Sequence, residues 1–194
     1  MVCVGFVRSF NSAVMAVVRY LPDYQLDTSF GTGGVATVAF AGGQAEANRA
    51  VLLPTGALVL GGFVERSFDR SLAMARLTAS GALDTTFGVG GLVERVIPGD
   101  SSETIQAMLE FQGQLFVAAS TLESGNFALL RFNPDGIVDT SFGTAGLASA
   151  DFNGMADSSA SLAVHQGALL VGGYTGALNQ SESRNLGLAR FLTT

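Results

Sequence analysis

The sequence predicts an all-β fold made of about three and a half copies of one four-stranded antiparallel unit. Three observations support this prediction. A nine-residue motif occurs three times, an arginine stands at a fixed distance before each copy, and a strand-like segment that ends in small residues occurs four times. Hydrophobic residues make up 48% of the chain and charged residues 13%, which excludes a disordered protein.

The nine-residue motif has the pattern Asp-Thr-(Ser/Thr)-Phe-Gly at its centre. Its aspartates are Asp27, Asp84 and Asp139, which lie 57 (84 − 27) and 55 (139 − 84) residues apart. A phenylalanine and a glycine follow each aspartate at fixed positions. These residues are Phe30, Gly31, Phe87, Gly88, Phe142 and Gly143.

An arginine stands eight residues before each motif aspartate, at Arg19, Arg76 and Arg131. A fourth copy, Arg190, occurs in the segment LARFL and has no aspartate after it, since the given chain stops at Thr194. The third marker is the small residue that ends a strand-like segment. It is found at Gly5, Gly62, Ala119 and Gly173, with spacings of 57 (62 − 5), 57 (119 − 62) and 54 (173 − 119). Because three markers keep nearly one period, we interpret the chain as a repeat array.

Each full period contains four strand-like segments. In the middle period these are Leu92–Ile97, Glu103–Leu109, Gln114–Ser120 and Phe127–Phe132, and a type I turn at 133–136 follows them. Both faces of these segments are largely apolar, so we expect both faces of the sheet to be covered. Four-stranded antiparallel sheets packed face to face around an axis form a β-propeller, which is the predicted architecture.

The strand count predicts an incomplete propeller. Two strands precede Leu21, and three sets of four follow, which gives about three and a half blades. We expect a single repeat domain, 1–194. It has a partial repeat 1–26 and full repeats 27–83, 84–138 and 139–194. Since such an array does not close regularly, three explanations stay open: missing repeats of a longer propeller, a second copy that completes the ring, or a strained four-bladed ring.

These motifs resemble the delta-60 repeat family, a bacterial β-propeller repeat domain. The resemblance covers essentially the whole chain. The chain departs from the family pattern at Ala145, which replaces the first of two paired glycines, and at 118–119, where Ala-Ala replaces Gly-Gly. The resemblance implies a propeller fold and an extracellular or cell-envelope location, but no defined activity.

The Arg/Asp pairs have two interpretations. Each pair flanks a turn and can meet across it, either as part of a ring of charges that binds a polar ligand or as an ion pair that fixes the turn. Repetition in every unit favours the structural role, because a ligand site usually breaks repeat symmetry. The recurring phenylalanines likewise indicate buried wedges between blades rather than a platform on which a ligand stacks.

Other chemical candidates are few. His165 is the only histidine and Cys3 the only cysteine. The sequence therefore does not supply the full set of residues for a zinc site or for a histidine-dependent catalytic triad. We expect an exposed His165 and a buried Cys3. The acidic stretch 151–157 is either a calcium-binding loop or, as we favour, a solvated loop. The longest irregular stretch, 175–185, is a weak candidate for binding. No catalytic residue, metal ligand or cofactor is predicted.

Charge and hydropathy restrict the partners. The net charge of −6 disfavours nucleic acid, and no apolar run is long enough to span a bilayer. The N-terminal segment lacks the features of a signal peptide. We therefore predict a non-catalytic propeller module. It binds an unknown ligand or protein, or serves as a structural part of a larger extracellular or envelope protein. The alternatives are a propeller-type hydrolase or lyase with its site at the central tunnel mouth, and a calcium-dependent binding module.

Overall fold

Short antiparallel strands and tight turns make up the regular structure of the chain. The computed structural model describes residues 1–194 except 101, 122–124, 153, 155, 177–183 and 194. Within these residues the chain forms strands and no helix. The described part of the chain therefore contains no helix that is long and apolar enough to cross a membrane. The chain divides into two compact units, Met1–Arg95 and Val96–Thr194.

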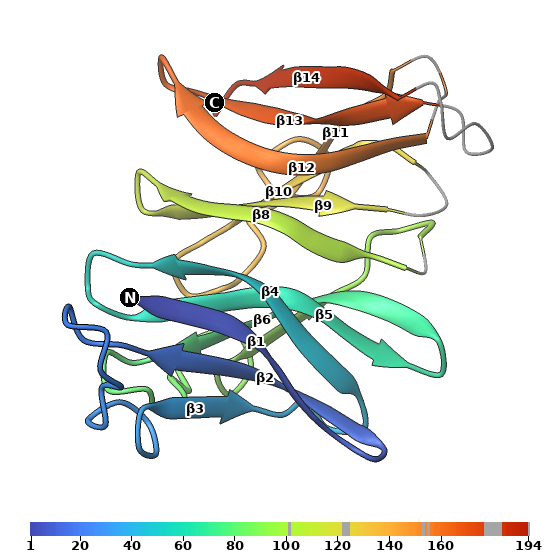
Figure 1. Cartoon of the computed structure of the whole chain (residues 1–194). Helices are drawn as coiled ribbons and strands as arrows, with labels where there is room; N and C mark the ends of the chain where they lie inside the picture. The colour runs from blue at the N-terminus through green and yellow to red at the C-terminus, as the bar shows by residue number, and fades with distance from the viewer. Residues whose placement is uncertain (101, 122–124, 153, 155, 177–183, 194) are drawn as a thin grey trace. The chain divides into compact units, whose positions relative to one another are not determined.

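The first unit contains two sheets, shown from blue to green in Figure 1. In both sheets, strands that are adjacent in sequence are hydrogen-bonded neighbours. The three-stranded sheet consists of β1 (Val2–Ser9), β2 (Ser12–Arg19) and β3 (Val35–Val38). The four-stranded sheet consists of β4 (Gln44–Leu52), β5 (Leu58–Arg66), β6 (Asp69–Leu77) and β7 (Leu92–Arg95).

The second unit repeats this plan with the two sheet sizes in the opposite order (Figure 1). Its four-stranded sheet consists of β8 (Thr104–Phe111), β9 (Gln114–Ser120), β10 (Phe127–Phe132) and β11 (Leu147–Ala150). Its three-stranded sheet consists of β12 (Ala156–His165), β13 (Ala168–Gly176) and β14 (Asn185–Phe191). Four antiparallel sheets without helices confirm the predicted all-β fold class for the described residues.

The predicted number of strands, fourteen, is confirmed in the described part of the chain, but their predicted grouping is wrong. The segment from Leu92 was expected to begin a new sheet. Instead β7 pairs with β6, with Ala75 opposite Leu92 and Leu72 opposite Arg95. The loop after the motif folds back onto the strand that carries the arginine, so each short strand completes the preceding sheet. The domain assignment 1–194 and its repeat boundaries stay predictions.

Three of the four small residues of the third marker, Gly62, Ala119 and Gly173, lie opposite a β-bulge. In β4 the register shifts between Ala47 and Arg49, where the strand faces Gly62 and Gly61. The same shift occurs in β8 opposite Ala119 and in β12 opposite Gly173. An added Cβ at Gly62 would lie 1.9 Å from the carbonyl oxygen of Glu46. The small residue therefore lets the backbone of the bulged strand approach closely.

Each unit has its own apolar core. In the first unit Met15 and Val17 of β2 belong to one buried cluster with Leu60 of β5 and Ala75 of β6. In the second unit Phe127 and Leu129 of β10 share a buried cluster with Leu169 and Val171 of β13. One face of each three-stranded sheet is thus buried with its four-stranded neighbour, as blade-to-blade packing requires.

Candidate functional site

The motif forms a closed loop around the arginine of the preceding strand. We call residues 27–34, 84–91 and 139–146 the motif loops. In each one the backbone N–H of the aspartate donates to the carbonyl of the arginine, at 2.8–2.9 Å. The N–H of the arginine in turn donates to the carbonyl of the last glycine of the loop, at 3.0–3.2 Å. The backbone C=O and N–H of the arginine are therefore hydrogen-bonded to the first and the last residue of the motif loop, respectively.

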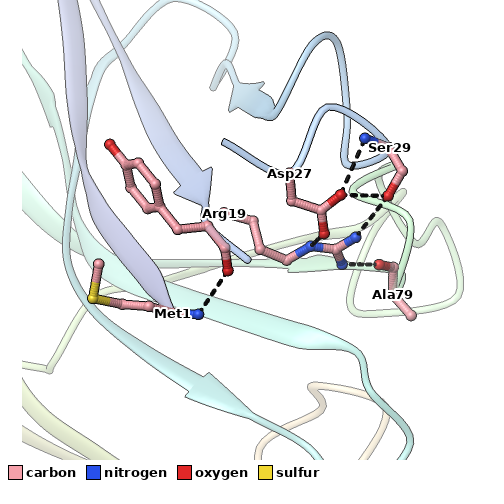
Figure 2. A network of polar contacts seen from close by, with 6 residues as sticks. Met1, Arg19, Asp27, Ser29 and Ala79 are labelled. Carbon is pink, nitrogen blue, oxygen red and sulfur yellow. Dashed lines mark hydrogen bonds and ion pairs between the residues drawn. The ribbon is translucent and has the colours of Figure 1, made fainter. Parts of the chain in front are cut away.

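All three arginines form an ion pair with their motif aspartate. The Nε–Oδ2 distances are 2.7 Å for Arg19–Asp27, 2.7 Å for Arg76–Asp84 and 2.9 Å for Arg131–Asp139. The carboxylates are mostly covered, with 14% to 22% of each side chain exposed. Figure 2 shows the first pair, with Ser29 and Ala79 around it. The structure thus brings together the residues that the sequence placed eight positions apart.

The hydroxyl residue two positions after each aspartate completes the polar network. Ser29 donates to Asp27 Oδ1 from its backbone N–H at 3.1 Å and from its hydroxyl at 2.5 Å. Thr86 and Ser141 do the same for Asp84 and Asp139. Each hydroxyl also accepts from an arginine NH2, at 2.8–3.4 Å. These three residues were not among the predicted site residues, although the recurring Ser or Thr at this position of the motif was a signal for them.

These hydrogen bonds change the acidity of the motif aspartates. The hydroxyl of Ser29 makes the largest contribution to lowering the pKa of Asp27 below its usual 3.8, followed among the favourable contacts by the Arg19 side chain. The hydroxyls of Thr86 and Ser141 likewise lower the pKa of Asp84 and Asp139 more than any other group does. All three carboxylates are therefore stabilised in their ionised form.

The motif phenylalanines lie beneath the arginines rather than in the open. The guanidinium carbon of Arg19 lies 4.4 Å from the ring centroid of Phe30, and the two equivalent distances are 4.9 Å. Phe30 and Phe142 are almost fully buried, and Phe142 also meets Phe116 edge to face at 5.9 Å. Because the arginine covers one side of each ring, the motif phenylalanines offer no open platform for stacking a ligand.

The arginine also links its own sheet to the following one. Arg19 NH1 donates to the carbonyl of Ala79 at 2.5 Å, and the N–H of Gly31 donates to the carbonyl of Ser80 at 2.8 Å. In the second unit Arg131 NH1 donates to the carbonyl of Thr193 at 2.7 Å. Ala79 and Thr193 occupy the same repeat position, three residues after the next marker arginine.

The first glycine of each motif loop is required by the geometry. Gly31, Gly88 and Gly143 have φ values of +56°, +54° and +55°. An added Cβ there would lie 2.1–2.2 Å from the carbonyl oxygen of the residue four positions later. Only glycine combines this left-handed conformation with this approach.

The remaining candidates lie apart from the motif loops. Arg190 is exposed on β14, and His165 is exposed at the end of β12 as expected. Cys3 is exposed on β1, so the expectation that it is buried is wrong. Of the side chains of β1, only Val2 and Val4 pack against the core cluster of the first unit. Because side chains alternate along a strand, Cys3 points to the other face.

The two candidate loops are only partly described. Asp151 accepts a hydrogen bond from the N–H of Gly154, and Asp157 accepts one from the N–H of Phe152. Asn153, which also carries a side-chain oxygen in the stretch 151–157, lies outside the described residues, as do residues 177–183 of the stretch 175–185. Among the described residues, no three His, Cys, Asp or Glu side chains gather to form a metal site.

Comparison with known families agrees with this architecture. A family model described as a domain of unknown function (DUF5122) with a β-propeller fold matches residues 53–87 and 113–142. Each matched stretch covers the strand that ends in small residues, the arginine strand and the motif as far as its phenylalanine. No curated protein matches the chain. The chain is therefore similar to a β-propeller repeat domain whose function is unknown.

Proposed function

We propose that the chain is a non-catalytic repeat module of the delta-60 type. It would act in binding, or as a structural part of a larger extracellular or cell-envelope protein. The motif loops, which are its most regular chemistry, would hold the sheets together rather than bind a ligand. Binding of an unknown protein or ligand would then fall to surfaces outside these loops.

One observation supports this proposal: the guanidinium groups are already used within the chain. Arg131 contacts Asp139 through Nε, Ser141 through NH2 and the carbonyl of Thr193 through NH1. Arg19 makes the same three kinds of contact. A guanidinium group with all of its nitrogens engaged has little capacity left for a ligand. An arginine that bound substrate would instead present donors to an open surface.

A double-mutant cycle on the second motif loop tests this role. We expect Arg76→Ala and Asp84→Ala each to lower the free energy of unfolding by about 1–3 kcal/mol, because each leaves a charged group without its main partner. The double variant should lose less than the sum, since both changes remove the same interaction. Urea denaturation followed by circular dichroism measures all three values.

Arg8→Ala is the matched control for the cycle. Arg8 also pairs with a carboxylate, that of Glu46, but its side chain is 59% exposed, so we expect a loss below about 1 kcal/mol. Full additivity of Arg76→Ala and Asp84→Ala, or losses no larger than that of Arg8→Ala, would contradict the structural role.

A further inference from the structure

The β1–β2 and β5–β6 hairpins of the first unit both carry an exposed phenylalanine at the turn. Phe10 is fully exposed and Phe68 is 92% exposed. Each is the third residue of the tripeptide Arg-Ser-Phe, which stands at 8–10 and again at 66–68. Because rings this exposed add nothing to the core, packing does not explain why the tripeptide recurs. We call Phe10 and Phe68 the tip phenylalanines.

The exposure of Phe68 does not arise from an open sheet edge. β5 and β6 are the two central strands of a four-stranded sheet, with β4 and β7 on their outer sides. Arg66 lies opposite Asp69, so Ser67 and Phe68 form the two-residue turn that joins the two strands. The hairpin is therefore complete on both sides, and its turn projects beyond the sheet.

The backbone of this turn is unfavourable for phenylalanine. Ser67 has φ +50° and Phe68 has φ +78°. Positive φ at both central residues is typical of a type I′ turn, in which asparagine and glycine are preferred. A bulky side chain at positive φ is an outlier. Since glycine at position 68 would form this turn more readily, the ring at that position points to a role outside the fold.

The two tip phenylalanines lie at the same end of the first unit (Figure 1). Arg8, near the end of β1, pairs with Glu46 of β4 at 2.5 Å. Glu46 in turn lies opposite Phe63, near the end of β5. Because the two turns directly follow β1 and β5, both apices can meet one surface.

Balanced charges surround the bases of the two hairpins. Three arginines near the turns each form an ion pair with a glutamate: Arg8–Glu46, Arg66–Glu94 and Arg70–Glu65. Arg66 also donates through NH2 to the carbonyl of Ala41 at 2.9 Å. This end of the first unit therefore presents two apolar points among ion pairs, without an excess of positive charge.

A lipid bilayer fits this arrangement better than a folded protein does. A specific protein interface needs a continuous patch of about 800 Å² per partner with an apolar core. The tip phenylalanines are instead separate projections on two hairpins, with charged side chains around them. A bilayer accepts isolated aromatic rings beneath its headgroups, while the charged side chains around them remain at headgroup level.

We propose that the tip phenylalanines insert into the surface of a lipid bilayer and hold the first unit on it. The rings supply the affinity, and the ion pairs remain among the headgroups. Net charge adds no attraction to anionic lipid, because the chain carries −6. Two buried rings give weak attachment, with half of the protein bound near about 1 mM accessible lipid. The proposal rests on the proposed function in one respect, which is that binding falls outside the motif loops.

Binding to phosphatidylcholine vesicles tests this assignment. The wild-type chain should co-sediment with the vesicles, and raising the salt from about 0.1 M to about 1 M should not weaken binding, since salt screens only charges. Phe68→Gly should raise the lipid concentration for half-binding about tenfold. The same variant should keep or raise the thermal midpoint, because glycine suits the turn. Combined with Phe10→Ser, it should abolish binding.

A tryptophan at the tip reports insertion directly, because the chain contains no other tryptophan. The emission of Phe68→Trp should shift to the blue when vesicles are added, and brominated lipid should quench it. Val89→Trp is the matched control. Val89 is 88% exposed and lies in the motif loop that follows the other end of β6, so its emission should not shift.

Several results would overturn the proposal. Equal co-sedimentation of wild type and the double variant would show that the lipid contacts another surface. Absence of wild-type binding up to about 10 mM lipid would exclude insertion of both rings. Binding that requires phosphatidylserine and is lost in salt would indicate an electrostatic contact instead. A blue shift of Phe68→Trp without lipid that depends on protein concentration would identify a second copy as the occupant.

Failure here is distinguishable from failure of the proposed function. The double-mutant cycle on Arg76 and Asp84 measures a motif loop, whereas vesicle binding measures the hairpin turns. A non-additive cycle without vesicle binding would keep the structural role of the motif loops and remove the bilayer as a partner.

Discussion

Thr86 donates two hydrogen bonds to the same oxygen of Asp84, from its backbone N–H at 3.1 Å and from its hydroxyl at 2.7 Å. The other carboxylate oxygen pairs with Arg76. The carboxylate is therefore an acceptor on both sides, and protonation would remove acceptor capacity that the loop uses. Ser29 and Ser141 stand in the same relation to Asp27 and Asp139. Protonation of the aspartate should therefore weaken each of the three motif loops in the same way.

Stability should fall in acid because of these three carboxylates. The pKa of each carboxylate is lower in the folded chain than its ordinary value of 3.8. The contribution of these carboxylates to the free energy of unfolding is therefore fully present above pH 3.8, and it is lost as the pH falls through the lowered pKa of the folded chain. We expect the free energy of unfolding to decrease between about pH 4 and pH 2. Urea denaturation at a series of pH values measures this dependence.

The variant Asp27→Asn/Asp84→Asn/Asp139→Asn should be less stable near neutral pH and show a flatter decrease in acid. Asp69→Asn is the matched control, because Asp69 is exposed at the tip of the β5–β6 hairpin and should leave the slope unchanged. If wild type and the triple variant had the same slope, other groups would be responsible.

Gly62→Ala should destabilise the chain, whereas Gly5→Ala should not. The two glycines share a repeat position, but only Gly62 faces a bulged strand, where an added Cβ would lie 1.9 Å from the carbonyl oxygen of Glu46. An added Cβ at Gly5 would have no atom within 4 Å. We expect a loss of about 1–3 kcal/mol for Gly62→Ala and a change within about 0.5 kcal/mol for Gly5→Ala. Thermal denaturation compares them, and equal losses would count against the bulge as the cause.

Ala145→Gly should stabilise the chain. Ala145 has φ +53°, and the equivalent positions hold Gly33 at φ +59° and Gly90 at φ +62°. The space beside these two glycines is open, so the cost at Ala145 arises from its left-handed backbone rather than from a clash. We expect a gain of about 0.5–1 kcal/mol, and a similar loss for the reverse change Gly90→Ala. Destabilisation by Ala145→Gly in chemical denaturation would refute this account.

Calcium and EDTA should leave the thermal midpoint unchanged. Asp151 and Asp157 each already accept a backbone hydrogen bond. Differential scanning fluorimetry in the presence of calcium or EDTA tests this expectation, with magnesium as the control for a general effect of divalent ions. A calcium-specific rise that Asp151→Asn abolishes would instead support the calcium-dependent alternative.

Sequence periodicity predicted the fold class and the Arg/Asp pairs because both depend on spacing within one repeat. It placed the segment at Leu92 in the wrong sheet, because the choice of neighbour is made by hydrogen bonds such as that from Arg76 to Gly91, which periodicity does not reveal. The role of Thr86 was missed for a related reason. A hydroxyl in a turn is common, and only the geometry shows that it contacts both members of the ion pair.

The bulge opposite Gly62 illustrates the same limit. The sequence signalled a small residue there, but its cause is the approach of Glu46 on another strand. Buried Phe30 was predicted from its recurrence. Its contact with the Arg19 guanidinium was not, since the two residues lie on opposite sides of a turn whose shape only the structure gives.

The contact of Arg19 with Ala79 determines where this chain can be cut and rejoined. The two residues are 60 positions apart, so the hydrogen bonds that finish one period are supplied by the period after it. A cassette exchanged between homologous arrays at any join between positions 19 and 79, whether in the motif loop or at the exposed hairpin tip of Ser67 and Phe68, would take donor and acceptor from different arrays. Longer arrays should therefore be built from cassettes that keep the two partners of this bond together.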